Sequence, residues 1–295
     1  MNHPLFQGSG VAIITPFTQD GVDGDALDAL IDFQLENGTD AIIVCGTTGE
    51  PSTMSEEEKD LVIARAVKRV DGRVPVIAGT GGNDTMKTIR AARRAKALGA
   101  DAQLCVTPYY NKTTQHGLIA HYTAIAEDGS LPVIIYNVPA RTGLNMQPET
   151  LAVLAKHENI IAMKEASGNI SQIMEMVRLC AADIAFYSGN DDHVLPLLAL
   201  GFQGVISVSA NVVPRQMHEL VDTYLQGDGK KALALQMKVN PLISSLFCEV
   251  SPVPVKTALR LMGKCSGILR MPLVEMLPAN RQRLKHEMRA IGLLR

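Results

Sequence analysis

Eight short apolar runs recur along the chain, and each is followed by a longer segment of helical periodicity. The spacing of about 20 to 35 residues fits a strand, a loop, a helix and a return loop. The runs are continuously apolar rather than alternating, which is typical of parallel strands covered by helices. We therefore expect strands at residues 11–16, 41–45, 74–79, 102–107, 133–137, 160–165, 185–188 and 204–209.

The segments between these runs carry helix start and stop signals. Ser55 followed by Glu58 is a capping-box pattern. Residues 83–85 predict the start of the next helix, and Gly99 its end. Pro148 and Pro214 are typical of the first helical turn.

Eight strand–helix units predict an α/β fold, and specifically a closed (β/α)8 TIM barrel. The alternative is a doubly wound sheet, which is disfavoured because no GxGxxG follows the first predicted strand. After residue 209 the pattern is purely helical. We assign residues 1–225 to the barrel and residues 226–295 to a C-terminal extension of about three helices packed on it.

Composition narrows the class of protein. A content of 46% hydrophobic and 20% charged residues with a net charge of -2 indicates a soluble globular protein and gives no reason to expect nucleic acid or a membrane as partner. The five cysteines show no CxxC spacing, which favours a reduced cytoplasm over a disulfide framework. Residues 1–10 lack a signal-peptide pattern, and no apolar run approaches the roughly 20 residues of a membrane span.

Active-site groups of such barrels lie at the carboxyl ends of the strands. Lys164 lies there, in an apolar run where a charge is expensive. Burial would depress its pKa and leave part of the amine neutral and nucleophilic, as an imine-forming lysine requires. The alternative is a lysine paired with a buried carboxylate, and on Lys164 alone the two interpretations are evenly balanced.

Neighbouring residues at the same predicted barrel face favour imine chemistry. The small-residue turn at residues 46–49 could present N–H groups and hydroxyls to a carboxylate, although such turns also have purely steric causes. Tyr136 could move protons or simply pack at the rim. Arg141 could clamp a carboxylate or lie in solvent. The seven histidines show no metal-site spacing, and residues 190–192 fit a helix start better than a cation site.

Four motifs together resemble a known family. They are Gly-Thr-Thr-Gly-Glu at residues 46–50, Val-Thr-Pro-Tyr-Tyr at 106–110, Tyr-Asn-Val-Pro-Ala-Arg-Thr at 136–142 and Lys-Glu-Ala at 164–166. Their order and spacing resemble the dihydrodipicolinate synthases, in the pyruvate aldolase family that includes N-acetylneuraminate lyase. The resemblance extends over essentially the whole chain, including residues 251–256 and 269–272.

The resemblance implies a role for each matching residue. Lys164 forms the imine with pyruvate, while Thr48 and the backbone at Thr47 hold the pyruvate carboxylate. Thr47, Tyr136 and Tyr110 form a proton relay in which Tyr110 comes from the neighbouring subunit.

The second half of the implied site takes the aldehyde substrate. Arg141 meets the carboxylate of L-aspartate 4-semialdehyde, while Gly189 and the Ile206 carbonyl line the pocket. The sialic acid lyases normally lack an arginine at the position of Arg141, so its presence favours a small acidic aldehyde.

The resemblance thus implies a Schiff-base-forming lyase of the diaminopimelate route to lysine, without a metal or organic cofactor, assembled as a homotetramer built as a dimer of dimers. The alternatives are a related 2-oxo acid aldolase, such as N-acetylneuraminate lyase, and a catalytically silent relative that acts as a binding protein.

Some members of this family are inhibited by L-lysine at a cleft between subunits. Asn83 and Tyr109 match that effector site. The remaining positions depart from the pattern of the regulated bacterial enzymes. The departures are Pro51, Ser52, Glu56, Lys59 and Lys87. Lys87 puts a cation where an acidic group should meet the ammonium of the effector. We predict a vestigial site and weak or absent inhibition by lysine.

Overall fold

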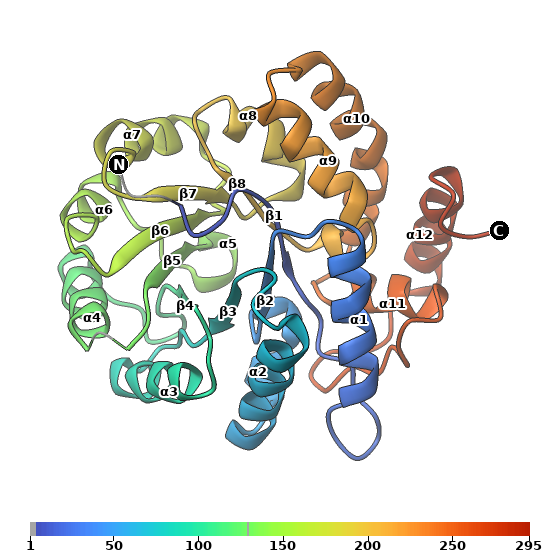
Figure 1. Ribbon diagram of the computed structural model, residues 1–295, viewed down its shortest axis with the longest axis horizontal. Coiled ribbons are helices and arrows are strands. Elements are labelled where there is room, and N and C mark those ends of the chain that lie inside the picture. Colours follow the sequence, from blue (N-terminus) through green and yellow to red (C-terminus); the bar gives the residue numbers. More distant parts are fainter. Residues whose placement is uncertain (1–3, 129) are drawn as a thin grey trace.

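The computed structural model describes residues 4–128 and 130–295, so the first three residues of the segment expected to lack a signal peptide lie outside it. Within the described part, eight parallel strands close into a barrel in sequence order (Figure 1). The TIM barrel prediction is confirmed. The strands are β1 (Gly8–Ala12), β2 (Ala41–Val44), β3 (Val76–Gly79), β4 (Ala102–Val106), β5 (Val133–Asn137), β6 (Ile160–Glu165), β7 (Ala185–Ser188) and β8 (Gly204–Ser207).

Helices cover the outside of the barrel, where they shield the outer face of the sheet from water. Four short 3-10 turns, η1 (Thr47–Gly49), η2 (Pro51–Thr53), η3 (Asp191–His193) and η4 (Ser209–Asn211), lie in loops. The helices are α1 (Gly24–Glu36), α2 (Glu56–Val70), α3 (Thr85–Ala97), α4 (Gln115–Glu127), α5 (Pro139–Thr142), α6 (Pro148–Leu154), α7 (Ile170–Cys180), α8 (Val194–Leu198) and α9 (Pro214–Leu225).

The helix signals in the sequence act as expected. Ser55 caps α2 through a reciprocal capping box with Glu58. The Asp84 side chain accepts a hydrogen bond from the third residue of α3, and the backbone turns away after that helix at Gly99 with φ +93°. Pro148 and Pro214 are the first residues of α6 and α9.

The first strand lies further upstream than its apolar run predicts. We expected residues 11–16, but β1 is Gly8–Ala12, so this boundary was wrong. The small residues before Val11 belong to the sheet because Gly8 and Ser9 pair with Gly204 and Val205 of β8. Position 8 requires glycine, since a Cβ there, at a φ of +124°, would lie 2.0 Å from the Asp40 carboxylate. Ile13 still donates to the Ile43 carbonyl at 3.0 Å before the chain leaves the barrel, which explains why the apolar run continues.

The amino-terminal end of the barrel is closed by an aromatic stack. Phe6 and Tyr187 lie with their ring centroids 4.3 Å apart, and the Tyr187 hydroxyl donates to the Phe6 carbonyl at 2.7 Å. Both residues belong to the apolar cluster that fills the barrel interior. Because this end is packed, chemistry is confined to the opposite, carboxyl end of the strands.

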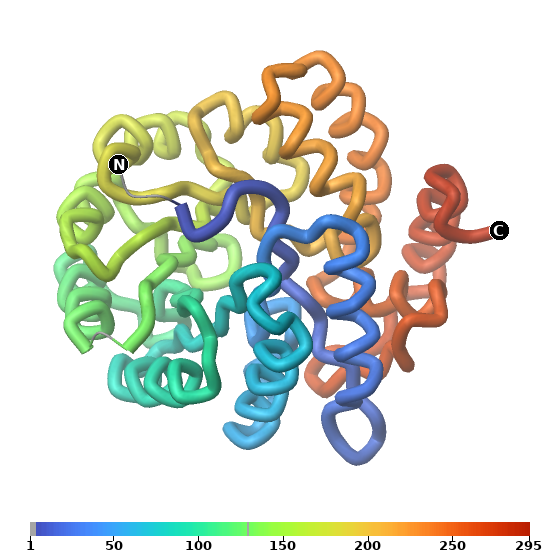
Figure 2. The backbone as a smooth tube through the Cα atoms, viewed as in Figure 1, coloured from blue at the N-terminus to red at the C-terminus, as the bar shows by residue number. Residues whose placement is uncertain are grey.

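The C-terminal extension contains α10 (Gly229–Leu246), α11 (Val253–Leu261) and α12 (Pro278–Ala290), as the prediction of about three helices requires. The tube in Figure 2 shows α10 running beside α9, with α11 and α12 at the side of the barrel that carries α1. One continuous apolar cluster joins Leu242 and Leu284 of the extension to Ile14 and Val213 of the barrel. The extension therefore packs on the barrel.

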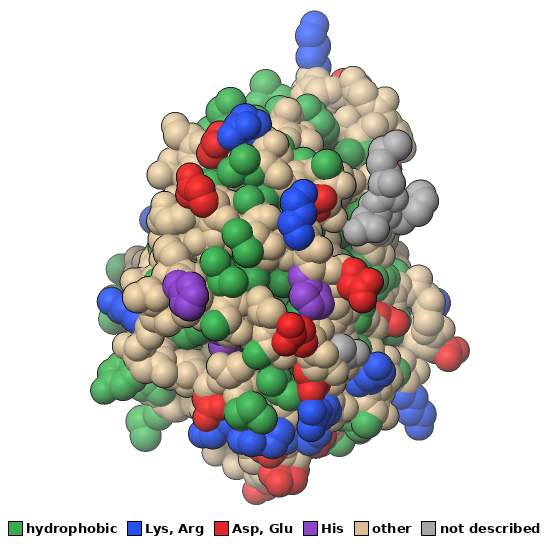
Figure 3. All heavy atoms as spheres, turned by 90° about the vertical axis from the view of Figure 1, so that its left-hand side faces the viewer, with side chains coloured by type: hydrophobic (Ala, Val, Ile, Leu, Met, Phe, Trp, Pro, Cys, Tyr) green, Lys and Arg blue, Asp and Glu red, His purple; other side chains and the backbone are tan. Residues whose placement is uncertain are grey.

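The described residues show neither a membrane-spanning helix nor a cluster of metal ligands. No helix there is long and apolar enough to cross a membrane. No group of three or more His, Cys, Asp or Glu side chains there is arranged to hold a metal ion. On the face shown in Figure 3, Lys and Arg side chains lie interspersed with Asp and Glu.

Candidate active site

A cavity of about 200 Å³ lies at the carboxyl end of the barrel. Its lining comes from residues within β1, β4, β5 and β6, from residues that follow β2, β5, β6, β7 and β8, and from Phe247 and Ser251 of the C-terminal extension. Six of the predicted site residues contribute to its wall: Thr47, Thr48, Tyr136, Arg141, Lys164 and Gly189. Residues spread over more than 140 positions of sequence are thus brought together by barrel closure, about as expected for this fold.

Lys164 is buried in β6 without a counter-ion. The residue is 4% exposed, and in residues 4–128 and 130–295 no carboxylate lies within 4.0 Å of its amine. Burial lowers the pKa of Lys164 from 10.5 to about 8; the charge of Arg141 lowers it further, and that of Asp191 opposes the shift. The ion-pair interpretation of Lys164 is therefore wrong, and the lowered pKa leaves more of the amine neutral, as a nucleophile requires.

Tyr136 lies beside Lys164 on the neighbouring strand. The two residues are register partners between β5 and β6, and in-register neighbours project to the same face of a sheet. The amine lies 4.3 Å from the centre of the Tyr136 ring. Burial raises the pKa of Tyr136 to about 12, which keeps its phenol protonated near neutral pH. A protonated phenol can both donate and accept a hydrogen bond, which suits the transfer of protons.

The turn at residues 46–50 is bounded by two residues in the left-handed conformation, Cys45 with φ 54° and Glu50 with φ 55°. Between them, η1 presents the buried Thr48 and the exposed Thr47. The first N–H groups of a helical turn have no acceptor within it, so they remain available to a ligand. This turn needs Gly79 beside it, because a Cβ there would lie 2.1 Å from the Cys45 carbonyl oxygen.

Gly189 makes room for the lysine. A Cβ at this position would lie 2.7 Å from the Ala166 Cβ and 3.1 Å from the Lys164 Cε. Only a residue without a side chain leaves Lys164 in its observed position.

Arg141 lies in the short helix α5, where its guanidinium donates to the Ser251 carbonyl at 3.3 Å. Within the described part of the chain, no carboxylate forms an ion pair with it. It also lines a second cavity of about 330 Å³, which shares Thr47 and Tyr136 with the first. Arg141 thus offers a cation where the two cavities meet.

Two of the eight residues predicted for the active site line neither cavity. Tyr110 is 92% exposed and has φ 67°, so its side chain projects away from its own chain's site. Ile206 is fully buried in β8 and belongs to the barrel interior.

The residues matched to an effector site do lie together. Asn83 donates to the Tyr109 carbonyl at 3.2 Å, and Asn111 donates to the Asn83 carbonyl at 2.9 Å. Tyr109 lines the second cavity with Pro51 and Ser52.

Sequence reasoning missed the importance of Asp191, which we considered as a cation ligand or a helix start. It does begin η3, but its buried carboxylate also accepts from the Val208 and Ser209 backbones through Oδ2. Its Oδ1 has no hydrogen-bond partner among the described residues. The charge acts on Lys164 from beyond ion-pair distance, and no local sequence pattern signals that effect.

A polar network also supports β6 from outside the barrel. Glu165, the neighbour of Lys164, accepts from the Asn137 side chain at 2.9 Å and from the Ser167 backbone at 2.5 Å. Asn137 in turn donates to the Asn145 side chain at 2.9 Å. The alternation of side chains along a strand separates this network from the lysine.

Comparison with known proteins gives a consistent result. A model of the dihydrodipicolinate synthetase family matches residues 5–291. A 4-hydroxy-tetrahydrodipicolinate synthase of Acetivibrio thermocellus is 53% identical over 294 residues, which cover 100% of both chains. The crystal structure of dihydrodipicolinate synthase from Aquifex aeolicus is 46% identical with a TM-score of 0.96, covering 98% of this chain and 99% of the other. A structure described as a monomeric dihydrodipicolinate synthase variant is 44% identical with a TM-score of 0.97, covering 98% of each chain.

The family match spans almost the whole chain, barrel and extension alike, and the relatives agree with it in length. Their shared name places them among the lyases of lysine and diaminopimelate biosynthesis. The chain belongs to the dihydrodipicolinate synthetase family and is a lyase of that biosynthetic route.

Proposed function

We propose that this chain condenses pyruvate with L-aspartate 4-semialdehyde through a Schiff base on Lys164. The observation that carries the proposal is the buried amine of Lys164, which has a pKa lowered to about 8 and no carboxylate partner in the described residues. A lysine with an ordinary pKa would be almost entirely protonated at neutral pH and could not attack a ketone at a useful rate.

The neutral amine adds to the C2 ketone of pyruvate, and loss of water gives the imine. The protonated imine draws electrons from C3, which loses a proton and then attacks the aldehyde carbon of the second substrate. The amine of that substrate next displaces Lys164 from the imine carbon, which closes the ring and frees the lysine. Thr47, Tyr136 and Tyr110 carry the protons, and no metal or organic cofactor is required because the imine is the electron sink.

Carboxylate binding divides between the two ends of the cavity. The turn containing Thr48 receives the carboxylate of pyruvate, in line with its small residues and available N–H groups. Arg141 receives that of the aldehyde, supported by a guanidinium at the junction of the two cavities that forms no ion pair with any described residue. Gly189 completes the wall of the pocket. The role expected for the Ile206 carbonyl stays a prediction, since Ile206 lies outside the lining of both cavities.

Borohydride reduction in the presence of pyruvate tests the proposal directly. Peptide mass spectrometry should find one reduced pyruvate adduct per chain, on Lys164, and none in a Lys164→Ala control. An unmodified Lys164 would rule out the Schiff base, as expected for a silent relative.

A second candidate function is that of a related 2-oxo acid aldolase, such as N-acetylneuraminate lyase. Turnover of L-aspartate 4-semialdehyde is compared with that of N-acetylmannosamine and of simple aldehydes, each with pyruvate. The presence of Arg141 favours the acidic aldehyde by a charge-assisted bond of about 1.5–3 kcal/mol. A preference for N-acetylmannosamine would transfer the chain to the lyase subfamily.

Tyr110 serves the active site of a neighbouring subunit in a homotetramer built as a dimer of dimers. Its 92% exposure and its strained φ of 67° support insertion into a partner. Mixing inactive Lys164→Ala and Tyr110→Phe proteins should restore activity, because each mixed pair contains one site with both residues intact. Failure of the mixture to regain activity, or sedimentation as a monomer like that described for one relative, would reject this assembly.

Lysine inhibits the enzyme weakly or not at all. Glu56 is held by Arg94 at 2.6 Å, and the exposed Lys87 adds a cation near Asn83. Both features oppose binding of an ammonium group at the former effector cleft. Strong inhibition by lysine at millimolar concentration would contradict this assignment.

The chain divides at the α9–α10 connection, into a catalytic barrel at residues 1–225 and a helical extension at 226–295. The end of α9 at Leu225 and the start of α10 at Gly229 support this division. The enzyme works in the cytoplasm, in keeping with five cysteines that are free in the structure. No nucleic acid partner is proposed.

A further inference from the structure

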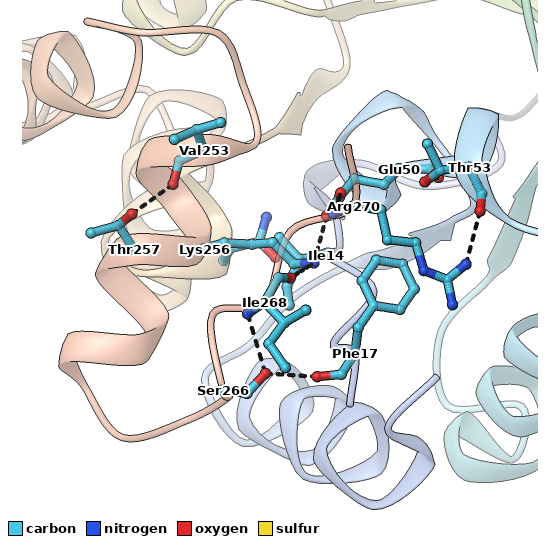
Figure 4. Close-up of polar contacts among 11 residues, drawn as sticks. Ile14, Phe17, Glu50, Thr53, Val253, Lys256, Thr257, Ser266, Ile268 and Arg270 are labelled. Carbon is cyan, nitrogen blue, oxygen red and sulfur yellow. Dashed lines mark hydrogen bonds and ion pairs between the residues drawn. The ribbon is translucent and has the colours of Figure 1, made fainter. Parts of the chain in front are cut away.

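The C-terminal extension reaches the turn at residues 46–50 through a buried ion pair. Lys256 of α11 donates from Nζ to Glu50 Oε1 at 2.5 Å and to the Ile268 carbonyl at 2.8 Å (Figure 4). The two charged side chains are 1% and 2% exposed. A pair so well shielded from water is far stronger than a surface salt bridge once formed, and breaking one partner leaves the other charge buried.

The other oxygen of Glu50 is held by the extension as well. The backbone N–H of Arg270 donates to Glu50 Oε2 at 3.1 Å, and its guanidinium donates to the Thr53 carbonyl at 2.8 Å. Both Lys256 and Arg270 lie 4.1 Å from the ring centre of Phe17. Figure 4 shows the two cations arriving from the extension onto Phe17 and Glu50 of the barrel.

Glu50 needs such support because its own conformation is unfavourable. It has φ 55° and ψ 43°, in the left-handed region that costs a residue other than glycine about 1–2 kcal/mol. Its N–H donates to the Thr47 carbonyl at 3.2 Å, so Glu50 closes the same small turn that presents Thr48 to the cavity. A displacement of Glu50 is therefore passed to Thr47 and Thr48.

The same stretch of the extension reaches the other end of the site. The Ser251 carbonyl accepts the hydrogen bond from Arg141, and Ser251 lines both cavities. Only four residues separate Ser251 from Lys256 in the sequence. The extension thus contacts both proposed carboxylate-binding elements.

We infer that Lys256 is a positioning residue for substrate binding: through Glu50 it fixes the turn that receives the carboxylate of pyruvate. The inference rests on the proposed function, which supplies the substrate. Lys256 itself does not line either cavity and does not contact the reacting atoms.

The first test is Lys256→Met, which keeps the length of the side chain and removes its charge. Misplacement of the turn should raise the KM for pyruvate by roughly 10- to 100-fold. At saturating pyruvate, kcat should fall much less, and the acid limb of its pH profile should stay in place because Lys164 is untouched. An unchanged KM for pyruvate would overturn the inference.

A double variant, Lys256→Met with Glu50→Gln, separates positioning from mere stability. Removing both charges abolishes the orphaned buried carboxylate, so the melting temperature should recover toward that of the wild type. The KM for pyruvate should remain raised because the tie between extension and turn is still missing. Recovery of KM together with stability would reduce Lys256 to a structural role. If the single variant does not fold, the double variant carries the test.

Arg260→Met is the matched control, since Arg260 also lies in α11 and forms an ion pair, with Glu275, but is half exposed. Its KM for pyruvate should equal that of the wild type. Borohydride trapping of the wild type in the same series distinguishes failure of the proposed function from failure of the role proposed for Lys256. A wild type that does not trap pyruvate overturns the proposed function and this inference together, whereas a wild type that traps, with an unchanged KM in the Lys256 variants, overturns this inference alone.

Discussion

Two buried lysines, one in the barrel and one in the extension, show that the same side chain can have two different roles. Lys164 is 4% exposed and Lys256 is fully buried. Each lies against an aromatic ring, at 4.3 Å from the centre of Tyr136 and 4.1 Å from that of Phe17. Burial lowers the pKa of both amines. The environments differ chiefly in the distance from the amine to a carboxylate.

Lys256 has Glu50 at 2.5 Å and a backbone carbonyl besides, so its cost of burial is offset by a strong pair. Lys164 has no carboxylate within 4.0 Å in the described part, and the more distant Asp191 offsets its cost of burial only in part. A buried ammonium group without a close counter-ion loses its proton more readily, and the neutral amine that results is nucleophilic. The fold therefore holds one lysine in a buried ion pair and leaves the other without one.

Removal of the Lys164 amine should have the largest effect on turnover. Lys164→Met should lower kcat at least about 1000-fold, because the imine cannot form without the nucleophile. Steady-state kinetics and borohydride trapping measure the loss. Lys256→Met should retain the adduct on Lys164 at high pyruvate, and if it too lost all trapping, the division of roles between the two lysines would be wrong.

The same two substitutions should change stability in opposite directions. The pKa of Lys164 falls from 10.5 to about 8 on folding. Its buried charge therefore opposes folding by about 3 kcal/mol below pH 8, and this penalty fades as pH rises to 10.5. The Lys164→Met protein should therefore be more stable than the wild type by about 3 kcal/mol at pH 7, and equally stable above pH 10.5. Lys256→Met should lose about 3–5 kcal/mol because Glu50 is left unpaired.

Urea denaturation followed by circular dichroism, at a fixed protein concentration, measures both changes. Loss of stability in Lys164→Met would mean that a partner does stabilise the charged form of this amine. The two lysines would then not differ in whether a partner stabilises their charge.

The sequence alone distinguished these lysines only in part. Lys164 was visible because a charge stands out in a continuously apolar strand. Lys256 was not, because a lysine in an amphipathic helix is expected in solvent, and its partner Glu50 lies 206 residues earlier. The family resemblance included residues 251–256 but gave no reason for them. Long-range pairs of this kind depend on how the extension packs, which local patterns do not encode.

The fold was predictable to a similar depth. The bounds of β5, β6 and β7 follow their apolar runs residue by residue, because helices cover these strands on the outside. The start of β1 does not, because Gly8 and Ser9 carry no apolar side chain. A Cβ on Gly8 would clash with the Asp40 carboxylate, and the Ser9 N–H donates to that carboxylate. Hydrophobic periodicity finds strands by their apolar side chains, and small residues that pair without one escape it.

A smaller effect should come from crowding the lysine. Gly189→Ala would place a Cβ 3.1 Å from the Lys164 Cε and 2.7 Å from the Ala166 Cβ. A displaced amine should lower kcat/KM by roughly 10- to 100-fold. Gly229→Ala is the control, because the nearest atom to its added Cβ lies 3.8 Å away. Full activity in Gly189→Ala would show that Lys164 can react from another position.

The smallest effect should be a shift of the pH profile. In the wild type, the acid limb of kcat/KM should lie near pH 8, where the free Lys164 amine becomes neutral. The negative charge of Asp191 favours the ammonium form, so Asp191→Asn should lower the pKa of Lys164 further and move this limb to lower pH. Asp192→Asn is the matched control, because that side chain is 60% exposed and solvent screens its charge. An unmoved limb in Asp191→Asn would mean that Asp191 does not contribute to the pKa of Lys164. A downward shift would show that the fold places an acid close enough to temper the lysine but too far away to pair with it, in contrast to Glu50 and Lys256.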